Sequence, residues 1–119
     1  MIRPPTPAPS EPAQPDRFRG TSHRWTFATG ALAGTACDYA FHEDWTLAWR
    51  VVAGANQGQL GRAREFRVTP AGPSRHLVTF APLPGVRLVA AVDFDTWQIA
   101  GFQFAGGEPQ AFGGSFRVL

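Results

Sequence analysis

From Phe18 onward the chain alternates large apolar residues with small or polar ones, in short runs that turn residues interrupt about every ten positions. Alternation with a period of two is typical of β-strands that bury one face. Segments rich in proline and glycine, such as Pro70-Ala71-Gly72-Pro73, separate the runs. The predicted strands cover residues 23–29, 35–42, 45–52, 62–69, 75–81, 86–93, 96–104 and 113–119.

These eight segments predict an all-β protein. No segment keeps a 3.6-residue period over the length of a helix, and a helical turn would fit only near residues 31–33 or 108–112. Because most connections are short, we expect antiparallel strands in up-and-down order. A meander of eight strands leaves no exposed edge when it closes into a barrel, and such a barrel can hold one small ligand.

The first eighteen residues differ in composition from the rest of the chain. They contain six of the eleven prolines, and almost nothing in them could pack against a core. Such a composition is typical of an extended or disordered segment. The sequence therefore predicts a proline-rich tail over residues 1–18 and one barrel domain over residues 19–119.

The third and fourth predicted strands form a hairpin that carries charges among aromatic residues. In the third strand Trp45, Leu47 and Trp49 share one face, and Arg50 lies on the other. Glu65 of the fourth strand can share the face of Arg50. On the outside such a pair is a salt bridge worth about 1 kcal/mol or less. Inside the barrel, Arg50 would bind an acidic group of a substrate and Glu65 would act as an acid or base. The strand phase leaves both readings open.

Aromatic residues in the first two strands supply candidate walls for a ligand pocket. Trp25 and Phe27 share a face of the first strand, and Tyr39 lies in the second. Such residues are expected in the core, where they would also line an apolar pocket. With Trp49 and His76 they are the predicted substrate-binding residues. The three histidines are not clustered in the sequence, so we expect no metal site and no other cofactor.

The distribution of charge argues against a nucleic acid as partner. The net charge is +2, and all eleven basic residues are arginines, which are not gathered into runs. Arg62, Arg64 and Arg67 form the densest basic segment, but alternation along a strand would divide them between two faces. No set of aromatic residues accompanies them as a platform for stacked bases.

The sequence also contains evidence on where in the cell the protein is found. No run approaches the eighteen or more apolar residues that a membrane-spanning helix needs, and the N-terminus lacks the apolar region of a secretory signal. We therefore expect a cytoplasmic protein without a membrane partner. Cys37 is the only cysteine, so no disulfide can form within the chain.

Several short motifs follow one another along the chain. They are Phe18-Arg19-Gly20, Trp25-Thr26-Phe27, the Gly30 turn, Trp49-Arg50, the loop from Gly54 to Gly61, Glu65, Leu77-Val78-Thr79-Phe80 and Val92-Asp93-Phe94-Asp95. Taken in this order, they resemble the calycin-type barrels of the phenolic acid decarboxylases and the MoaF-like proteins. Each motif is short, and their order and spacing carry the resemblance.

The resemblance implies a calycin-like barrel with a cavity. Arg50 and Glu65 fall at the positions of the arginine and the glutamate with which the decarboxylases hold a para-hydroxycinnamate and protonate its alkene carbon as carbon dioxide leaves. Two tyrosines of that family have no counterpart here, because Trp25 and Phe27 stand at their positions.

Two hypotheses of function follow. The first is a cofactor-free, decarboxylase-like lyase that acts on an aromatic or unsaturated acid, with Arg50 anchoring an anionic oxygen and Glu65 exchanging the proton. The alternative is a non-catalytic, lipocalin-like binding protein for a small hydrophobic molecule. If Trp45, Leu47 and Trp49 face outward, that apolar surface also predicts a homodimer.

Overall fold

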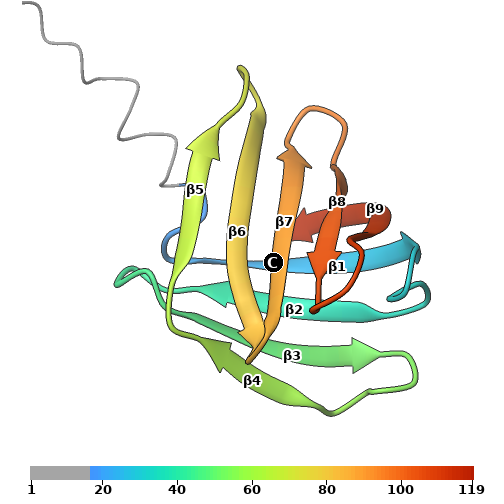
Figure 1. Cartoon of the computed structure of the whole chain (residues 1–119). Coiled ribbons are helices and arrows are strands. Elements are labelled where there is room, and N and C mark those ends of the chain that lie inside the picture. Colours follow the sequence, from blue (N-terminus) through green and yellow to red (C-terminus); the bar gives the residue numbers. More distant parts are fainter. Residues whose placement is uncertain (1–16) are drawn as a thin grey trace, which may run out of the picture.

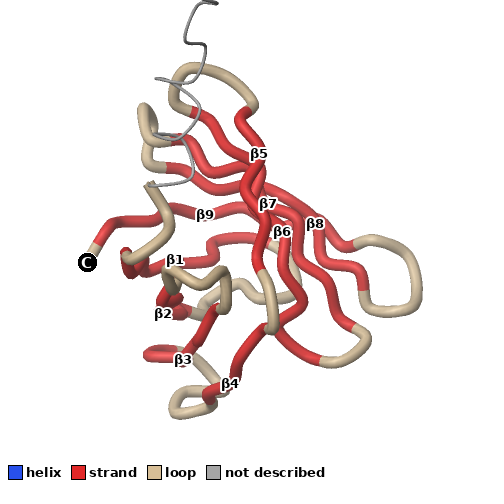
Figure 2. The backbone as a smooth tube through the Cα atoms, turned by 90° about the vertical axis from the view of Figure 1, so that its left-hand side faces the viewer, coloured by secondary structure: helices blue, strands red, loops and turns tan. Residues whose placement is uncertain are grey.

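The computed structural model describes residues 17–119, which form nine strands and no helix (Figure 2). The expected tail lies, up to residue 16, outside the described residues. The strands are β1 (Thr21–Thr29), β2 (Ala36–Phe41), β3 (Leu47–Ala53), β4 (Leu60–Ala63), β5 (Phe66–Pro70), β6 (Arg75–Leu83), β7 (Val86–Asp93), β8 (Gln98–Phe104) and β9 (Gln110–Val118).

The nine strands form one antiparallel sheet in the order β4-β3-β2-β1-β9-β8-β7-β6-β5. All neighbours but one are consecutive in the chain, as expected for an up-and-down barrel. The exception is the pairing of β1 with β9, which joins the first and last strands. The sheet bends so that β5 to β8 run steeply across β1 to β4 (Figure 1). The result is a nearly closed barrel, and the predicted all-β antiparallel fold is confirmed.

The prediction of eight strands is wrong, because the fourth predicted strand is broken at Arg64 and Glu65 into β4 and β5. Ala63 and Phe66 on either side of the break are 4% and 1% exposed. Residues three apart in a regular strand point to opposite faces. The two-residue break resets this alternation and lets both side chains reach the core.

The barrel opens between β4 and β5, the two ends of the sheet. Side-chain and backbone contacts take the place of strand pairing there. The backbone N–H of Phe66 donates to the carbonyl oxygen of Trp45 at 2.9 Å. The indole Nε1 of Trp49 on β3 donates to the carbonyl oxygen of Pro82 on β6 at 3.1 Å. The two ends of the sheet are therefore held together without a continuous ladder.

The interior of the barrel is a packed aromatic core. Trp25 and Tyr39 have ring centroids 4.7 Å apart, and Tyr39 meets Phe80 at 5.3 Å. Phe18, which the sequence assigns to the tail, is fully buried against His23 and Phe41, with ring centroids 5.1 and 5.3 Å apart. The barrel domain therefore includes at least one residue more than predicted.

Among residues 17–119 no helix is long and apolar enough to cross a membrane.

Candidate functional site

Arg50 and Glu65 both lie on the outside of the molecule. On β3, Leu47, Trp49 and Val51 point into the core and are 1%, 9% and 8% exposed, whereas Arg50 alternates with them and is exposed. Burying a large apolar side chain is favourable by about 2 kcal/mol, whereas burying an unpaired charge costs more than that. The apolar face therefore takes the interior, and of the two readings that the strand phase leaves open, the outward one holds for both charged residues.

The two residues are also far apart along the sheet. Arg50 is paired with Leu60 on β4, and Glu65 follows five residues later. At about 3.3 Å per residue, roughly 16 Å of strand separates the two positions. Glu65 instead accepts a hydrogen bond of 2.9 Å from Nε of Arg67. Arg50 and Glu65 therefore do not form one site.

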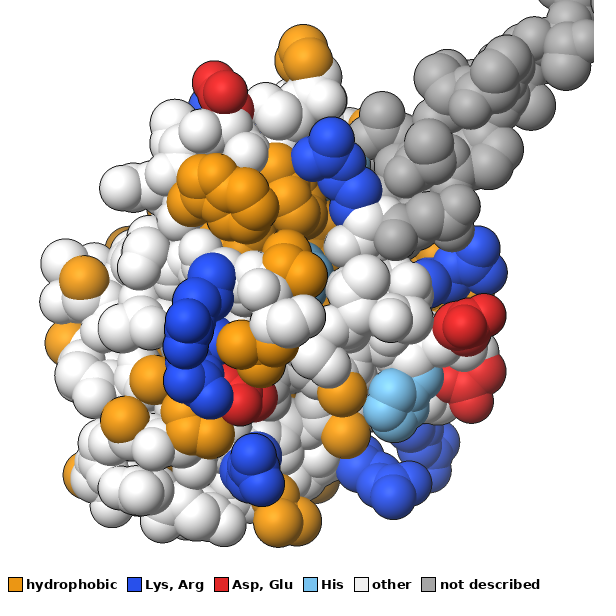
Figure 3. Space-filling view, turned by 180° about the vertical axis from the view of Figure 1, so that it is seen from behind, with side chains coloured by type: hydrophobic (Ala, Val, Ile, Leu, Met, Phe, Trp, Pro, Cys, Tyr) orange, Lys and Arg blue, Asp and Glu red, His pale blue; other side chains and the backbone are white. Residues whose placement is uncertain are grey.

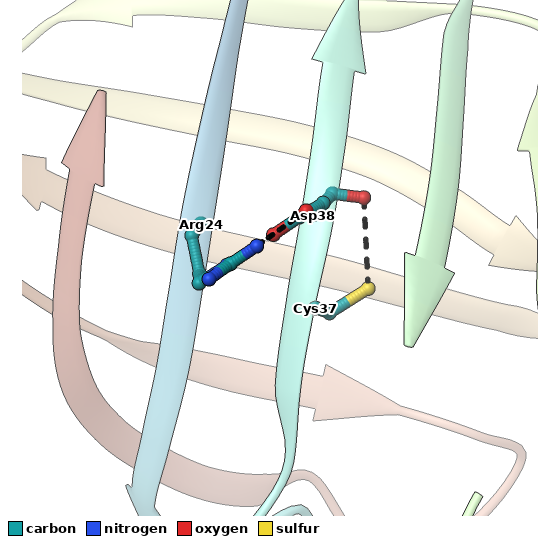
Figure 4. A network of polar contacts seen from close by, with 3 residues as sticks. All are labelled: Arg24, Cys37 and Asp38. Carbon is teal, nitrogen blue, oxygen red and sulfur yellow. Dashed lines mark hydrogen bonds and ion pairs between the residues drawn. The ribbon is translucent and has the colours of Figure 1, made fainter. Parts of the chain in front are cut away.

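Arg50 belongs to a row of charged residues on the outer face of the sheet. Register places Arg117, Arg24, Asp38 and Arg50 side by side on β9, β1, β2 and β3. Arg24 donates two hydrogen bonds to Asp38, of 2.6 Å from Nε and 3.0 Å from Nη2 (Figure 4). These bonds, aided by the nearby arginine charges, lower the pKa of Asp38. Figure 3 shows this rear face, where basic side chains gather around an acidic one.

The predicted aromatic wall residues are in the core. Trp25, Phe27 and Tyr39 are no more than 4% exposed and pack against one another. Trp49 is 9% exposed at the opening of the barrel. Burial raises the pKa of the Tyr39 hydroxyl well above its usual value. The structure thus gives these four residues a packing role, and whether any of them also meets a ligand stays a prediction.

His76 is fully buried in an aromatic cluster at one end of the barrel. Its ring lies 5.6 Å from both Phe18 and Phe94, and His23 lies 5.1 Å from Phe18. Burial lowers the pKa of His23 to about 4 and also lowers the pKa of His76. Both imidazoles are therefore neutral at pH 7. In the described part of the chain, no group of three or more His, Cys, Asp or Glu residues is arranged to hold a metal ion.

Cys37 is also a packing residue. Its side chain is 3% exposed, and its thiol lies 3.9 Å from the carbonyl oxygen of Asp38 (Figure 4). Burial raises the pKa of the thiol to about 11. A thiol of this kind is protonated and unreactive at neutral pH.

A groove with a volume of about 760 Å³ lies on the outside, next to the opening of the barrel. We call it the arginine groove, because four of its lining residues are arginines. The groove runs along three neighbouring strands. Arg67 on β5 pairs with Thr79 on β6, and Thr79 pairs with Val89 on β7. The lining residues are Arg62, Arg64, Glu65, Arg67, Thr79, Phe80, Ala81, Leu83, Pro84, Gly85 and Arg87.

The floor of the groove is low because the outward residues of β6 are small. Thr79 and Ala81 occupy the outer face of that strand, and longer side chains stand on the strands to each side. Arg67 rises from β5 and Arg87 from β7, while the end of β6 contributes Leu83. Four arginines against one glutamate leave three net positive charges. The arrangement suits an anion that also has an apolar part.

The break between β4 and β5 brings the basic residues together. The sequence predicts that Arg62, Arg64 and Arg67 are divided between two faces of one strand, and this is wrong, since all three line the same groove. Sequence reasoning also missed Arg87, whose alignment with this cluster depends on the pairing of β5, β6 and β7. One signal in the sequence could have indicated the groove. It is the pair of small residues, Thr79 and Ala81, at alternate positions of one strand.

Comparisons with known proteins identify a fold and no family. No family model and no curated protein matches the chain. Among solved structures, the chain is similar to a protein from Burkholderia vietnamiensis that is described as a putative beta-lactamase. The TM-score is 0.73, the sequence identity is 18%, and the match covers 100% of both chains. At this identity, the likeness shows that the two chains share their nearly closed antiparallel barrel.

Proposed function

We propose that the protein binds a small organic anion with an apolar or aromatic part in the arginine groove, as a binding protein without a catalytic role. The observation that carries the proposal is the convergence on one groove of Arg62, Arg64 and Arg67, from the broken strand β4–β5, with Arg87 from β7. A guanidinium group can bind a carboxylate through two parallel hydrogen bonds.

The groove also offers apolar contacts. Phe80 borders its floor, and Leu83 and Pro84 form the end that lies at the turn after β6. Leu83 is 51% exposed, so a ligand that covers it would remove apolar surface from water. An aromatic or unsaturated acid combines the two features that the groove can recognise. Such a ligand lies within the class that the sequence predicts.

The outward Arg50 and Glu65 weigh against the lyase hypothesis. A decarboxylase-like reaction needs both groups at one substrate, and they are separated by roughly 16 Å of strand. Three statements therefore stay predictions: the calycin-type assignment, the resemblance to decarboxylases and MoaF-like proteins, and the cytoplasmic location. The barrel architecture supports the first of them.

The description of the Burkholderia protein suggests β-lactams as test ligands, because these compounds join a carboxylate to an apolar ring system. It does not suggest a mechanism for this chain. A serine enzyme of the Ser-x-x-Lys type needs a lysine, and the sequence has none. We therefore treat β-lactams as members of the proposed ligand class.

The test is calorimetric titration with trans-4-hydroxycinnamate, a β-lactam and, as an uncharged analogue, 4-hydroxycinnamamide. We expect the acids to bind and the amide to bind at least tenfold more weakly. The double variant R62A/R87A should weaken binding of the acids at least tenfold, because even one hydrogen bond to a charged group contributes about 1.5–3 kcal/mol. R50A is the matched control and should bind like the unmodified protein.

Three outcomes would contradict the proposal. Equal binding of acid and amide would remove the role of the arginines, and unchanged binding by R62A/R87A would place the ligand elsewhere. Conversion of the acid, followed by mass spectrometry, would restore the enzyme hypothesis.

A single-stranded oligonucleotide in the same titration tests the prediction that no nucleic acid is bound.

A further inference from the structure

The outer surface of strands β6, β7, β8 and β9 carries two adjacent rows of mainly apolar residues. Strand register defines both rows. We call the surface that they form the β6–β9 face. The first row is Leu77, Ala91, Ala100 and Gly113, and the second row is Thr79, Val89, Phe102 and Ala111.

The face is exposed in the single chain. Phe102 is 49% exposed and Leu77 is 39% exposed, and Phe104, which follows Phe102 on the same side of β8, is 38% exposed. None of the eight residues in the two rows carries a charge. A contiguous apolar surface of this kind marks an interaction site in most proteins.

Charged residues occur at the two ends of the face. At one end Arg75 of β6 and Asp93 of β7 form an ion pair of 3.3 Å. At the other end Arg87 of β7 stands beside Phe104 of β8. The apolar rows thus have polar ends, which is the usual arrangement of a protein interface with a dry centre and a wet rim.

The sizes of the residues in the two rows are complementary, because large residues of one row stand next to small residues of the other. In β8, the large Phe102 belongs to one row and the small Ala100 to the other. In β7, Val89 is matched in the same way with Ala91. Consider a two-fold axis that lies between the two rows and runs perpendicular to the strands. It would pack two chains face to face, with the first row of each chain over the second row of the other. Phe102 would then lie over the Ala100 of the other copy.

The same axis matches the charges. Arg87 and Asp93 lie at opposite ends of β7, and both are on the outer face. Rotation about the axis reverses the direction of the strand, so that the Arg87 of each copy approaches the Asp93 of the other. The face is therefore complementary to itself in size, and the Arg87 of each copy approaches an Asp93 that is also paired with Arg75 of its own chain.

We infer that two copies of this chain associate through their β6–β9 faces, with the two sheets packed face to face. Four strands about 4.8 Å apart, and four rows of residues about 6.7 Å apart (the two apolar rows and the row at each end), give a projected area on the order of 500 Å². The accessible area is larger, since the side chains stand up from the sheet. A standard interface buries about 800 Å² per partner, and the face with its polar ends approaches that size.

This surface differs from the one that the sequence predicts for a homodimer. Leu47 and Trp49 of that predicted surface point into the core, and Trp45 is partly buried against it. The inference does not rest on the proposed ligand, although Thr79 and Arg87 belong to both the groove and the face.

The experiment measures molar mass by sedimentation equilibrium over a hundredfold range of protein concentration. The chain has a mass of 12.9 kDa, and we expect the unmodified protein to reach twice that value. The variant A100F should weaken association at least tenfold, because it sets two phenyl rings against each other across the axis. The double variant A100F/F102A exchanges the large and small positions, and it should restore the dimer.

The control is Leu60→Glu on β4, where the side chain is 73% exposed and lies outside the face. It should leave the dimer unchanged, and circular dichroism should show that each variant is folded. A monomer at all concentrations would overturn the inference. A dimer that A100F leaves intact, or that the double variant fails to restore, would overturn it as well.

Discussion

The indole nitrogen of Trp49 is joined to the carbonyl oxygen of Pro82 by a hydrogen bond of 3.1 Å that crosses the opening of the barrel. The two residues are 33 positions apart in the chain. The bond links β3 to β6, which do not pair in the sheet. It is therefore one of the contacts that hold the barrel nearly closed.

Replacing Trp49 by Phe should destabilise the protein by about 1–3 kcal/mol. The substitution removes the hydrogen bond and part of a buried ring, and both losses contribute. Urea unfolding followed by circular dichroism measures the change. Trp97→Phe is the control, because Trp97 is 45% exposed and we expect a change of about 0.5 kcal/mol or less. Equal stability of the two variants would mean that the bond across the opening has no net effect.

Gly61 should not tolerate a larger side chain. A Cβ atom at this position would lie 2.5 Å from Cζ2 of Trp49, so Gly61→Ala would force the indole ring out of its place. We expect a loss of about 1–3 kcal/mol in the free energy of unfolding. In the matched control Gly107→Ala, the new atom meets nothing within 4 Å. The prediction fails if the midpoints of urea unfolding agree for these two variants.

The stability of the protein should fall between pH 6.5 and pH 4.5. Burial lowers the pKa of His23 from 6.5 to about 4, while a backbone hydrogen bond to Arg17 acts weakly in the opposite direction. In this range the unfolded chain binds a proton that the folded chain does not, so stability is lost as the pH falls. A difference of this size corresponds to about 3 kcal/mol, most of which is lost by pH 4.5.

Urea unfolding at pH 7.5, 6.5, 5.5 and 4.5 measures this loss. His76, whose pKa burial also lowers, should add to it in the same direction. The variant His23→Phe keeps an aromatic ring in the cluster and removes the titrating group, so its stability should depend less on pH in this range. An identical slope in the variant would assign the acid sensitivity to other groups.

Glu65→Gln should tighten the binding of an acid in the arginine groove. The carboxylate now accepts a hydrogen bond from Arg67 and repels an incoming anion. The neutral amide would release Arg67 and raise the net charge of the groove, which we expect to increase affinity by about two- to tenfold, as for exposed ion pairs. Titration at two salt concentrations checks the effect, which should shrink at high salt. Weaker binding would show that Glu65 itself contacts the ligand.

The fold was largely predictable, because the alternation of residues along most strands is regular. The range 86–93 agrees with β7, and the other predicted strands lie within a few residues of the observed ones. The break in the fourth predicted strand was not predictable, because Arg62 to Thr69 reads as one alternating run. The need to bury both Ala63 and Phe66 becomes evident only when the barrel closes.

The candidate site was less predictable than the fold. Alternation correctly grouped Leu47 and Trp49 on one face and Arg50 on the other, but it could not say which face is inside. The core decides this, because the apolar side chains displace the charged one. The groove depends on register between strands that are distant in the sequence, such as the pairing that aligns Arg67 with Thr79.

The pairing of β1 with β9 has a consequence for how the chain folds. His23 pairs with Val118, and this separation of 95 positions makes the largest loop that the sheet closes. Closing a flexible loop of that length costs about 4 kcal/mol of entropy. The hairpins of β1 to β4 and of β5 to β9 close much shorter loops and can form first. We therefore expect two meanders to form early and the pairing of β1 with β9 to join them in the slow step of folding.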